Sequence, residues 1–476
     1  MPTLDILSKA KKDNINISGV SFDTRKLAKN NIFFAIQGSK DNGLKYIDEA
    51  IRKGASAIIV PYTPRKFIKK NIPVYKVHKI RTVLSETAFN FYRNNIKYKI
   101  AVTGTNGKTS VTFFINYLLK SLKKNSATIG TLGSSIGKKS IENLTTPDPV
   151  SLAKEMKLMY SKNIDYAIVE ASSHGLHQKR FSPIRFDLSI LTNISHDHLD
   201  YHKNIKNYIS SKLDLFKLYT NKNGKSLVNG ETKYLKEIKK SLYIDKIDYN
   251  IFSIGSKKYG IKKIVTKKNI TFVEVFINFK LHKFKFRDFP IFQIKNFLLA
   301  VIGLSLIGFD EKKMAKFSLN CPHVTGRMEL AGKTNNGARV YIDFAHTPDA
   351  LKNVLLEAKL ICKGQLVVLF GCGGNRDKKK RALMGNIAEQ FSDLGIVTDD
   401  NPRDEDADKI RKEIIQKSQK LLNFKNRRKA IKKSINLLKC KDILIIAGKG
   451  HEKYQIIKDK RLPFDDLKIA RNFLKR

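Results

Sequence analysis

Short apolar runs divide the first 90 residues into the elements of a small α/β unit. Residues 31–36 (NIFFAI) and 55–60 (ASAIIV) are rich in β-branched and aromatic side chains, which is typical of strands. Between them, residues 48–54 (DEAIRKG) predict a short helix that ends at a glycine. The pattern predicts a first domain over residues 1–90 that has no phosphate loop of its own.

A second set of apolar runs occupies residues 91–320. Residues 98–102 predict a strand and residues 111–119 an amphipathic helix, and residues 166–169 and 188–191 predict further strands. These last two strands end at polar residues, which is typical of a parallel sheet with its site at the carboxyl ends of the strands. Residues 257–286 alternate Ile, Val and Phe with Lys, which predicts strands of a smaller antiparallel sheet.

The last third of the chain, residues 321–476, repeats the pattern of buried strands separated by helices. Strands are predicted at residues 340–344, 365–370, 394–398 and 442–447. Each precedes a polar or glycine-rich segment, namely DFAHTPD, FGCGGNRDKKKR, TDDNPRDED and AGKGHEKYQ. Four unrelated loops would not all follow apolar strands. We therefore expect a second doubly wound α/β domain whose strand ends converge on a substrate site.

Composition and length narrow the class of protein. The 476 residues suffice for two to four domains, and 42% of them are hydrophobic, which is enough for well-packed cores. No run of about 18 apolar residues exists, and the N-terminus lacks an apolar signal-peptide core, so a cytoplasmic protein without membrane insertion is expected. The four cysteines are isolated, which argues against a zinc site or a disulfide framework.

The formal net charge of +48 raises the question of a nucleic-acid partner. The lysines are spread over the whole length, however, and basic repeats flanked by aromatic residues are absent. Asn and Ile are also abundant, as an AT-biased coding sequence would produce. Nucleic-acid binding is therefore not expected as the main role, although a basic surface attracts anionic small molecules such as nucleotides.

The segment VTGTNGKTS at residues 102–110 carries the strongest chemical signal. It lies between a predicted strand and a predicted helix, where Gly104 and Gly107 let backbone N–H groups converge on an anion. Lys108 can reach the β- and γ-phosphates of a nucleotide, and Thr109 can ligate Mg²⁺. Val102 departs from the full phosphate-loop pattern, and an ordinary strand-to-helix turn is the alternative. The favoured interpretation is a site for ATP or GTP.

Two polar residues after strands of the same domain are candidate Mg²⁺ ligands. Glu170 follows the strand at 166–169, and His198 lies in TNISHDHLDYH. A hydrogen-bonded structural histidine is the alternative for His198. His174, His196 and His202 are weaker candidates, expected to pack or to form hydrogen bonds.

Ten motifs, in order from residue 103 to 455, resemble those of the Mur ligase family, the ATP-dependent amide-forming enzymes of peptidoglycan precursor synthesis. The motifs are TGTNGKTSV, TTPDP, EASSHGLHQKR, TNISHDHLDYH, SKLDLF, TGRMEL, DFAHTPDAL, GCGGNRDKKKRALMG, DNPR and GKGHEKYQ. The N-terminal SFDTRKLAKNNIFFAIQG also resembles the family's uridine-nucleotide-binding start. The resemblance covers essentially the whole chain.

The resemblance implies three α/β domains. These are a small N-terminal domain for the UDP moiety, a central P-loop ATPase-like domain with a parallel sheet, and a C-terminal Rossmann-like domain for the amino acid. The members it is most similar to add meso-2,6-diaminopimelate to UDP-MurNAc-L-Ala-D-Glu. There, ATP phosphorylates the D-glutamate side-chain carboxylate, and the diaminopimelate amine attacks the acyl-phosphate.

The resemblance also assigns ATP and Mg²⁺ contacts. Thr109 and Glu170 would hold one Mg²⁺; His198 and Lys212 would hold a second, with Lys212 carbamylated to N6-carboxylysine. Ser211 replaces the alanine usual before that lysine, and an exposed helix lysine is the alternative for Lys212. The expected catalytic residues are Lys108, Lys212, His198 and Glu170. The expected ATP contacts are Gly104, Thr105, Asn106, Gly107, Lys108, Thr109, Ser110, Asn296, Arg327 and Asp343; interdomain salt bridges are the alternative for the last three.

The remaining implied contacts are those of the two substrates. Matching positions for the UDP-linked substrate are Phe22, Thr24, Thr145, Thr146, Ser172, Gln178 and Arg180, and Thr24 stands where a serine is common. Those for diaminopimelate are Arg376, Asp400, Asn401, Pro402, Arg403, Gly448 and Glu452. Arg403 can bind the distal carboxylate bidentately, and Glu452 can pair with the distal ammonium. A proline-stabilised helix entry is the alternative for the DNPR segment.

Three other functions compete with this one. A lysine-adding Mur ligase would gain nothing from Arg403, because lysine lacks the distal carboxylate. Folylpolyglutamate synthase shares the phosphate loop and the carbamylated lysine, but not the DNPR segment or the UDP-type start. A non-enzymatic protein that binds ATP or nucleic acid would leave Glu170, His198 and Lys212 without a role.

Overall fold

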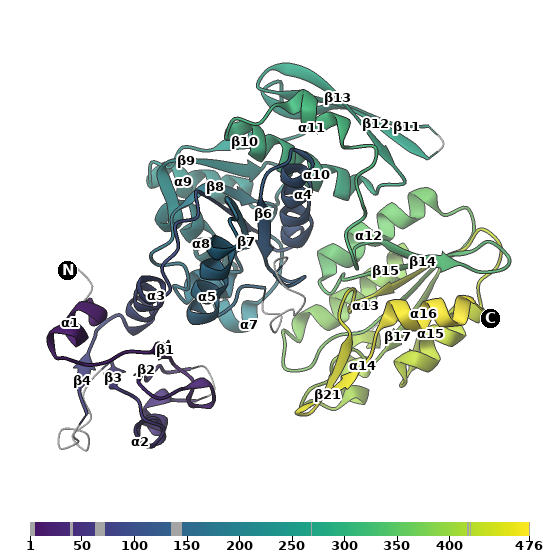
Figure 1. Cartoon of the computed structure of the whole chain (residues 1–476). Helices are drawn as coiled ribbons and strands as arrows, with labels where there is room; N and C mark the ends of the chain where they lie inside the picture. The colour runs from purple at the N-terminus through teal and green to yellow at the C-terminus, as the bar shows by residue number, and fades with distance from the viewer. Residues whose placement is uncertain are drawn as a thin grey trace.

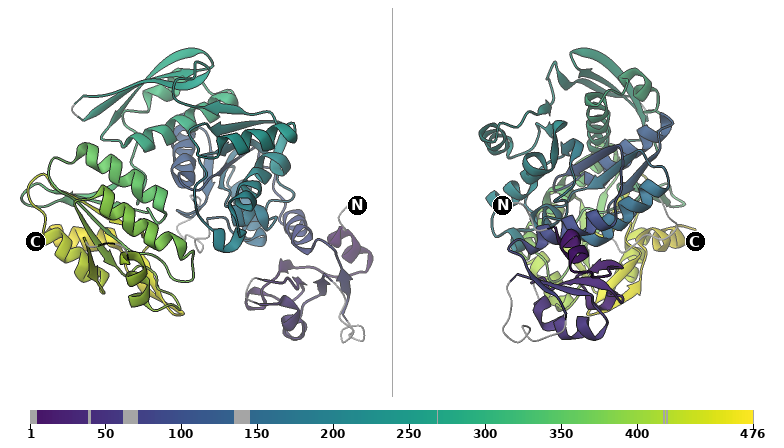
Figure 2. Two further views of the ribbon diagram at one scale, coloured as in Figure 1. Left: turned by 180° about the vertical axis from the view of Figure 1, so that it is seen from behind. Right: turned by 60° about the vertical axis from the view of Figure 1, so that its left-hand side comes forward.

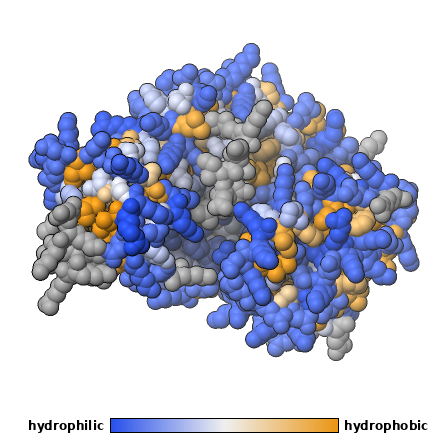
Figure 3. Space-filling view, turned by 60° about the horizontal axis from the view of Figure 1, so that its bottom comes forward, coloured by the Kyte–Doolittle hydropathy of each residue, from blue (hydrophilic) through white to orange (hydrophobic). Residues whose placement is uncertain are grey.

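A computed structural model of the chain describes residues 5–38, 41–61, 72–134, 145–267, 269–416, 418 and 420–475. Three α/β domains follow one another along the chain, and the central domain lies between the other two (Figures 1 and 2). The face in Figure 3 is predominantly hydrophilic, with scattered hydrophobic patches. Among the described residues, none of the helices combines the length and apolarity needed to span a bilayer.

The N-terminal domain is built on a four-stranded parallel sheet in the order β1-β2-β3-β4. Strands β2 and β3 are buried along their whole length, as expected for parallel strands covered on both faces. The elements are α1 (Ile6–Lys12), β1 (Gly19–Ser21), η1 (Thr24–Lys26), β2 (Asn31–Phe34), η2 (Gly43–Tyr46), α2 (Ile47–Arg52), β3 (Ala57–Val60), β4 (Val74–Lys76) and α3 (Ile80–Phe91).

The central domain contains a six-stranded parallel sheet in the order β10-β9-β8-β5-β7-β6. Alternate residues of β5 face opposite cores: Ile100 and Val102 pack with α4 and α10, and Ala101 packs in the core that contains α5. Its elements are β5 (Tyr98–Thr103), α4 (Lys108–Ser121), β6 (Ser126–Ile129), α5 (Pro149–Ser161), β7 (Tyr166–Glu170), α6 (Ser173–His177), β8 (Phe186–Leu191), α7 (Leu199–His202), α8 (Ile205–Asp214), η4 (Leu215–Tyr219), β9 (Thr220–Asn229), α9 (Leu235–Ile244), β10 (Asn250–Phe252) and α10 (Ile291–Leu306).

A three-stranded antiparallel sheet is attached to the central domain, as the alternating pattern predicts. It consists of β11 (Tyr259–Lys267), β12 (Ile270–Ile277) and β13 (Lys280–Arg287), with α11 (Glu311–Lys316) against β13. Inward residues such as Val273, Val275 and Phe284 are buried and join the core of α4 and α10. The sheet therefore extends the central domain (Figure 1).

The C-terminal domain has a six-stranded sheet in the order β14-β15-β19-β16-β17-β18. Only β14 is antiparallel to its neighbour; the other strands run parallel and end at one edge. Its elements are β14 (Glu329–Lys333), β15 (Arg339–Asp343), α12 (Pro348–Ile361), β16 (Leu366–Phe370), α13 (Lys379–Phe391), β17 (Leu394–Thr398), α14 (Ala407–Ile415), β18 (Leu421–Phe424), α15 (Arg427–Asn436), β19 (Ile443–Ala447), β20 (Tyr454–Ile457), β21 (Lys460–Pro463) and α16 (Asp466–Leu474).

Two connections run near the expected domain boundaries. Helix α3 continues to Phe91, and Ser85 on this helix donates a hydrogen bond to the carbonyl of Arg180 in the central domain (3.0 Å). Near residue 320, the Tyr117 hydroxyl of α4 bonds the carbonyls of Phe317 and Asn320 at 3.0 and 3.3 Å. The segment up to residue 320 is thus attached to the central domain.

Candidate active site

A cavity of ≈ 280 Å³ lies between the central and C-terminal domains. Its central-domain wall contains the phosphate loop (residues 104–110) and the segment after β8. Its C-terminal wall is formed by residues from all four segments that follow β15, β16, β17 and β19. The predicted convergence of these strand ends is therefore observed.

The backbone of the phosphate loop can be formed only with glycine at two positions. Gly104 and Gly107 have φ values of 148° and 84°. A Cβ atom on Gly104 would lie 1.9 Å from Thr192 Oγ1. The segment after β8 braces the loop, because Asn193 accepts hydrogen bonds from the amides of Thr105 (2.8 Å) and Asn106 (2.9 Å). Helix α4 begins directly after the loop, at Lys108.

Lys108 folds back over the phosphate loop. Its Nζ donates hydrogen bonds to the carbonyls of Gly104 and Thr105 at 2.9 and 2.8 Å. Burial lowers the pKa of this amine, although Glu170 and Asp197 oppose the shift. The loop thus holds a half-buried basic group whose hydrogen-bond acceptors are neutral carbonyls.

Glu170, at the end of β7, lies beside the start of α4. Its carboxylate accepts hydrogen bonds from the hydroxyls of Thr109 and Thr131, both at 3.0 Å, and from the amide of Thr131 at 2.9 Å. Burial raises the pKa of Glu170, while Lys108 and these hydrogen bonds act in the opposite direction. The adjacent hydroxyl and carboxylate oxygens of Thr109 and Glu170 are the hard ligands that Mg²⁺ prefers, so this pair fits the metal.

Lys212 is fully buried on α8, so the alternative of an exposed helix lysine is wrong. Its Nζ donates a 2.6 Å hydrogen bond to the carbonyl of Gly104 and lies 4.6 Å from the ring centroid of Tyr208. Burial, with Lys108 nearby, lowers its pKa well below the usual range for lysine. A free amine is not a Mg²⁺ ligand, so Lys212 fits a metal only after carboxylation; a neutral amine is the form that reacts with carbon dioxide.

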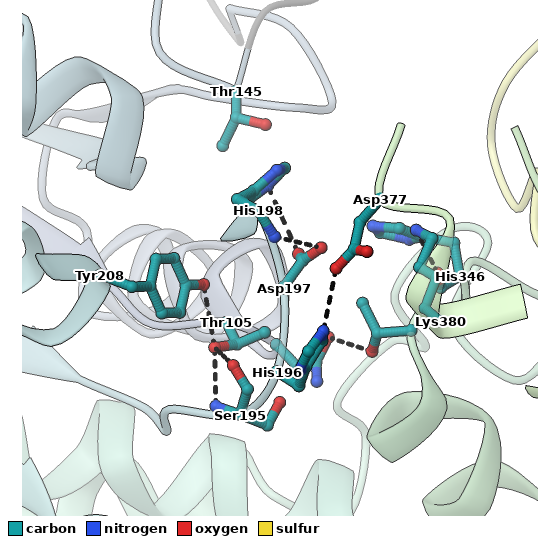
Figure 4. Close-up of polar contacts among 12 residues, drawn as sticks. Thr105, Thr145, Ser195, His196, Asp197, His198, Tyr208, His346, Asp377 and Lys380 are labelled. Carbon is teal, nitrogen blue, oxygen red and sulfur yellow. Dashed lines mark hydrogen bonds and ion pairs between the residues drawn. The ribbon is translucent and has the colours of Figure 1, made fainter. Parts of the chain in front are cut away.

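His198 lies in the cavity wall at the start of α7, with φ 53°. Its Nε2 is 3.4 Å from Asp197 Oδ2, and the two side chains adjoin Tyr208 and Thr105 (Figure 4). Burial lowers the pKa of His198 to about 3, although Asp197 opposes the shift. A neutral imidazole is the form that can bind a metal. Among the described residues, no group of three His, Cys, Asp or Glu side chains could hold an ion, so any metal here needs the mixed ligand set.

Asp197, His346, Asp377 and Lys380 lie around this cavity and were not predicted as site residues, and the weaker candidate His196 forms a hydrogen bond there, as expected. His196 Nε2 and Asp377 Oδ2 lie 2.9 Å apart and join the central and C-terminal domains, and Lys380 Nζ donates to the carbonyl of His346 at 2.8 Å (Figure 4). Burial alone would raise the pKa of Asp197, but its Coulombic interactions with His198, when that ring is protonated, and with Lys380 lower it. Asp377, Lys380 and His346 lie within sequence segments already singled out, so their position after strands was the available signal.

The expected adenosine contacts adjoin the phosphate loop. Arg327 donates a 3.3 Å hydrogen bond to the hydroxyl of Thr109 and lies 4.5 Å from the ring centroid of Phe344. Asp343 accepts from the amides of Met328 and Ala345, both at 2.7 Å, and burial raises its pKa to about 6.

Neither Arg327 nor Asp343 forms a salt bridge within the described parts of the chain. Asn296, on α10, is close enough that a Cβ on Gly107 would meet its Oδ1 at 2.9 Å. The described residues therefore give no support to the interdomain salt-bridge alternative for these positions, and the adenosine contacts stay a prediction.

Most of the expected contacts to the UDP-linked substrate form one hydrogen-bonded group. Thr146 donates to the carbonyl of Glu170 (2.6 Å) and accepts from the amide of Ser172 (2.9 Å). The Arg180 guanidinium donates to the carbonyl of Thr146 and, at 2.8 Å, to Gln178 Oε1. Thr145 lines the main cavity nearby.

Phe22 and Thr24 lie in the N-terminal domain and do not line the cavity between the central and C-terminal domains. A separate groove of ≈ 460 Å³ opens there at the carboxyl ends of β2, β3 and β4. Its lining includes Gln37, Gly38 and Arg81, and Arg81 donates a 2.7 Å hydrogen bond to the carbonyl of Gln37. Gln37 and Gly38 directly follow the strand predicted at residues 31–36, which was again the available signal, whereas Arg81 follows no predicted strand.

The expected diaminopimelate contacts cluster in the C-terminal wall. Arg376, Arg403 and Glu452 line the cavity with Asp400, Asn401 and Gly448, whereas Pro402 does not. The buried Lys449 was not predicted; it donates to Asn401 Oδ1 at 2.9 Å and lies 3.1 Å from Glu452 Oε2. The helix-entry alternative for DNPR is wrong, because α14 begins at Ala407 with Asp406 as its N-cap.

Two family models match the chain: the Mur ligase middle domain over residues 102–304 and the Mur ligase glutamate ligase domain over residues 326–450. UDP-N-acetylmuramoyl-L-alanyl-D-glutamate--2,6-diaminopimelate ligase of Rickettsia rickettsii is 40% identical over 476 residues, covering 97% of this chain and 96% of its own. Ligase 1 of this name from Clostridium acetobutylicum is 36% identical, covering 97% and 95%. A solved structure of a ligase with this name has a TM-score of 0.65 at 28% identity, covering 96% of this chain and 95% of that one.

Proposed function

The chain belongs to the Mur ligase family, and we propose that it is the ATP-dependent ligase that joins meso-2,6-diaminopimelate to UDP-MurNAc-L-Ala-D-Glu. The relatives that carry this activity in their names match nearly the whole chain. The nucleotide substrates are water-soluble, which supports a reaction in the cytoplasm. The +48 charge is then a feature that attracts anionic substrates, and nucleic acid is not the main partner.

One observation carries the proposal: the phosphate loop and the arginines of the C-terminal domain line the same cavity. A ligase of this type must bring a nucleotide phosphate, a carboxylate and an amine together. Lys108 lies at one wall, and Arg376 and Arg403 lie at the other. A protein that only bound ATP would not need the second wall.

The chemistry proceeds in two balanced steps. A carboxylate oxygen of the D-glutamate side chain attacks the γ-phosphorus of ATP, and the bond to ADP breaks to leave an acyl-phosphate. The amine nitrogen of diaminopimelate then attacks the acyl carbon, the amine loses a proton, and inorganic phosphate leaves. The first step converts a carboxylate, a poor electrophile, into an activated acyl group. Both steps bring anions together, so the site must supply positive charge.

The phosphate loop supports the first step through its position and charge. Its backbone amides and the Lys108 amine would bind the ATP phosphates, and Arg327, which already contacts Thr109, would add a second cation near the transferred group. Asn296 and Asp343 would contact the adenosine. Because Lys108 has only neutral carbonyl acceptors at 2.8–2.9 Å, it can turn to phosphate without breaking an ion pair.

Mg²⁺ would be held by Thr109 and Glu170, and a second ion by His198 with the carboxylated form of Lys212. When bound, Mg²⁺ neutralises phosphate charge and favours phosphoryl transfer. The buried amine of Lys212, whose pKa lies well below the usual range for lysine, is suited to carboxylation, and the product would turn a basic side chain into an anionic one beside the phosphate loop.

The two substrates would approach from opposite sides of the transferred phosphoryl group. Thr145, Thr146, Ser172, Gln178 and Arg180 would contact the peptide part of the UDP-linked substrate, with Phe22 and Thr24 at its UDP part. On the other side, Arg403 and Arg376 would bind the distal carboxylate of diaminopimelate, and Glu452 its ammonium.

The closest competing function is a ligase for L-lysine. Lysine has no distal carboxylate, so Arg376, which is exposed, and Arg403, which is half-buried, would have no anionic partner in its subsite. The arginine pair in the cavity wall favours diaminopimelate over lysine. Folylpolyglutamate synthase activity is less favoured, because it gives no role to the groove of the N-terminal domain.

An amino-acid panel tests the proposal. Phosphate release from ATP should require both UDP-MurNAc-L-Ala-D-Glu and meso-diaminopimelate, and L-lysine should be a poor replacement. Arg403→Ala should raise the KM for diaminopimelate about tenfold to hundredfold, which is about 1.4–2.7 kcal/mol, and leave the KM for ATP unchanged. Equal wild-type activity with L-lysine would refute the specificity, and a parallel loss of ATP binding in the variant would make Arg403 structural.

A further inference from the structure

The three largest fully buried side chains of the described residues are all arginines of the C-terminal domain, Arg381, Arg411 and Arg427. None of them lines the cavity. A buried guanidinium needs paired acceptors to offset its lost hydration, so each must have a specific partner. These partners lie at the bases of the segments that form the cavity wall.

Two of the arginines anchor single segments. Arg411 bonds to Asp399, immediately after β17 and before the DNPR segment. Arg427 forms a two-pronged pair with Asp466 at 2.9 and 2.7 Å and donates to the carbonyl of Ala447 at 2.9 Å, where β19 gives way to the AGKG segment. Each arginine thus fixes the point at which a cavity segment leaves the sheet.

Arg381 differs because it joins two cavity segments. Arg381 is the last residue of the GCGGNRDKKKR segment. Both of its terminal nitrogens donate hydrogen bonds to the Glu405 carboxylate, at 3.0 Å each. Glu405 follows Arg403 by two residues. Its carboxylate also accepts a hydrogen bond from the amide of Asn375, next to Arg376. One carboxylate is therefore tied to both segments that supply the cavity arginines.

Backbone contacts between the two segments leave little free space. The Gly374 amide donates a hydrogen bond to the carbonyl of Asn401, and the Arg403 guanidinium donates one to the carbonyl of Gly374, both at 2.9 Å. A Cβ atom on Gly374 would lie 1.9 Å from the carbonyl oxygen of Pro402. The spacing of the GCGGNRDKKKR and TDDNPRDED segments therefore depends on close backbone contact. The Arg381–Glu405 pair joins the same two segments next to this contact.

We propose that Arg381 and Glu405 form a positioning clamp that sets the separation of Arg376 and Arg403 and so determines selection for an amino acid with a distal carboxylate. The inference rests on the proposed function for the identity of that amino acid. Two arginines can bind one carboxylate strongly only if both reach it at once, so a small change in their separation lowers affinity. The clamp touches neither substrate nor reacting atoms.

The chain supplies a matched control for the clamp. Glu413, on α14, accepts a 2.7 Å hydrogen bond from Arg381 but lies outside both cavity segments. Glu405→Gln and Glu413→Gln each remove one carboxylate charge from the same buried arginine. Only Glu405→Gln weakens the connection between the two segments.

The test compares steady-state kinetics of the two variants in the full-length protein. Glu405→Gln should raise the KM for meso-diaminopimelate about tenfold or more, with the KM values for ATP and UDP-MurNAc-L-Ala-D-Glu changed less than about twofold. Its preference for diaminopimelate over L-lysine should fall by a similar factor. Glu413→Gln should keep the wild-type KM values even if its melting temperature falls. Equal shifts in both variants, or a rise of all three KM values in Glu405→Gln, would overturn the proposal.

Hydrogen exchange separates failure of the clamp from failure of the proposed function. If the wild type releases no phosphate with diaminopimelate, the proposed function fails, whatever the variants do. The clamp still predicts that Glu405→Gln, and not Glu413→Gln, speeds amide exchange across residues 371–377. Unchanged exchange in Glu405→Gln would reject the clamp independently of the substrate.

Discussion

The central and C-terminal domains treat their buried cations differently. In the central domain, the half-buried Lys108 and the fully buried Lys212 donate hydrogen bonds to carbonyls of the phosphate loop, including that of Gly104 in both cases. In the C-terminal domain, Arg381 and Arg427 are fully buried and pair with carboxylates at 2.7–3.0 Å. Both sets lie next to the same cavity.

The difference teaches what each wall is for. A cation such as Lys108, which faces only neutral dipoles, keeps its field for an incoming anion, as transfer of phosphate requires. Arginines already paired with carboxylates contribute little field, and they fix the backbone that carries other residues. The basic residues of the central-domain wall therefore provide positive charge for phosphate, whereas the paired arginines of the C-terminal domain fix the backbone that shapes the other wall. Substitutions should therefore have opposite signatures, lost activity in one and lost stability in the other.

Lys108→Met should have the largest effect. Loss of the amine that we propose binds the transferred phosphate should reduce ADP formation about a thousandfold or more, because an electrostatic contact made in the transition state would be removed. The free energy of unfolding should change little, since no ion pair is broken. The exposed Lys120, on the same helix, gives the matched control Lys120→Met. An activity loss below tenfold would remove Lys108 from the mechanism.

Arg427→Met tests the opposite wall. It leaves Asp466 buried without its partner, so the free energy of unfolding should fall by about 3–5 kcal/mol, measured by urea denaturation. Any folded variant should retain ATP binding, because Arg427 lies behind β19 and outside the cavity. Unchanged stability would contradict the structural role assigned to the paired arginines.

Lys212→Ala should reduce activity about a hundredfold. A short carboxylic acid such as acetate should restore part of it by replacing the carboxylated side chain, whereas the exposed neighbour variant Lys206→Ala should need no rescue. The assay is phosphate release with and without acetate at constant ionic strength. Wild-type activity in Lys212→Ala would refute the carbamate, and lost activity without rescue would leave the lysine with a packing role.

Glu155 is a buried carboxylate outside the site, and its substitution is the prediction with the smallest expected effect. It is buried on α5, and burial, with Asp148 nearby, raises its pKa to about 7 from 4.5. Between these values the folded state binds more protons than the unfolded state, so stability falls as pH rises. Glu155→Gln should therefore gain stability over the wild type from pH 4.5 to 7, reaching about 1–2 kcal/mol and then remaining constant. A difference between the two that does not change with pH would contradict this.

Most of the framework could be predicted from the sequence, because apolar runs and glycine turns report local structure. The strands before the phosphate loop and before the four C-terminal segments were found in this way, and the parallel sheets bring their ends together. Boundaries were less accurate: α4 begins at Lys108, before the apolar run that predicted it, because the helix starts within the phosphate loop itself. The helix-entry alternative for DNPR is also a boundary error, because α14 begins only at Ala407 and its N-cap is Asp406.

The sequence by itself determined the phosphate loop, the order of the strand-end segments and the membership in the Mur ligase family. Tertiary structure alone decided that Lys212 meets the carbonyl of Gly104, that His196 meets Asp377 across the domains, and that Arg381 is buried against Glu405. These pairs join residues on different elements, and no local pattern records their separation. Burial, which lowers the pKa of Lys212 and makes each buried arginine need a partner, exists only once the domains have packed.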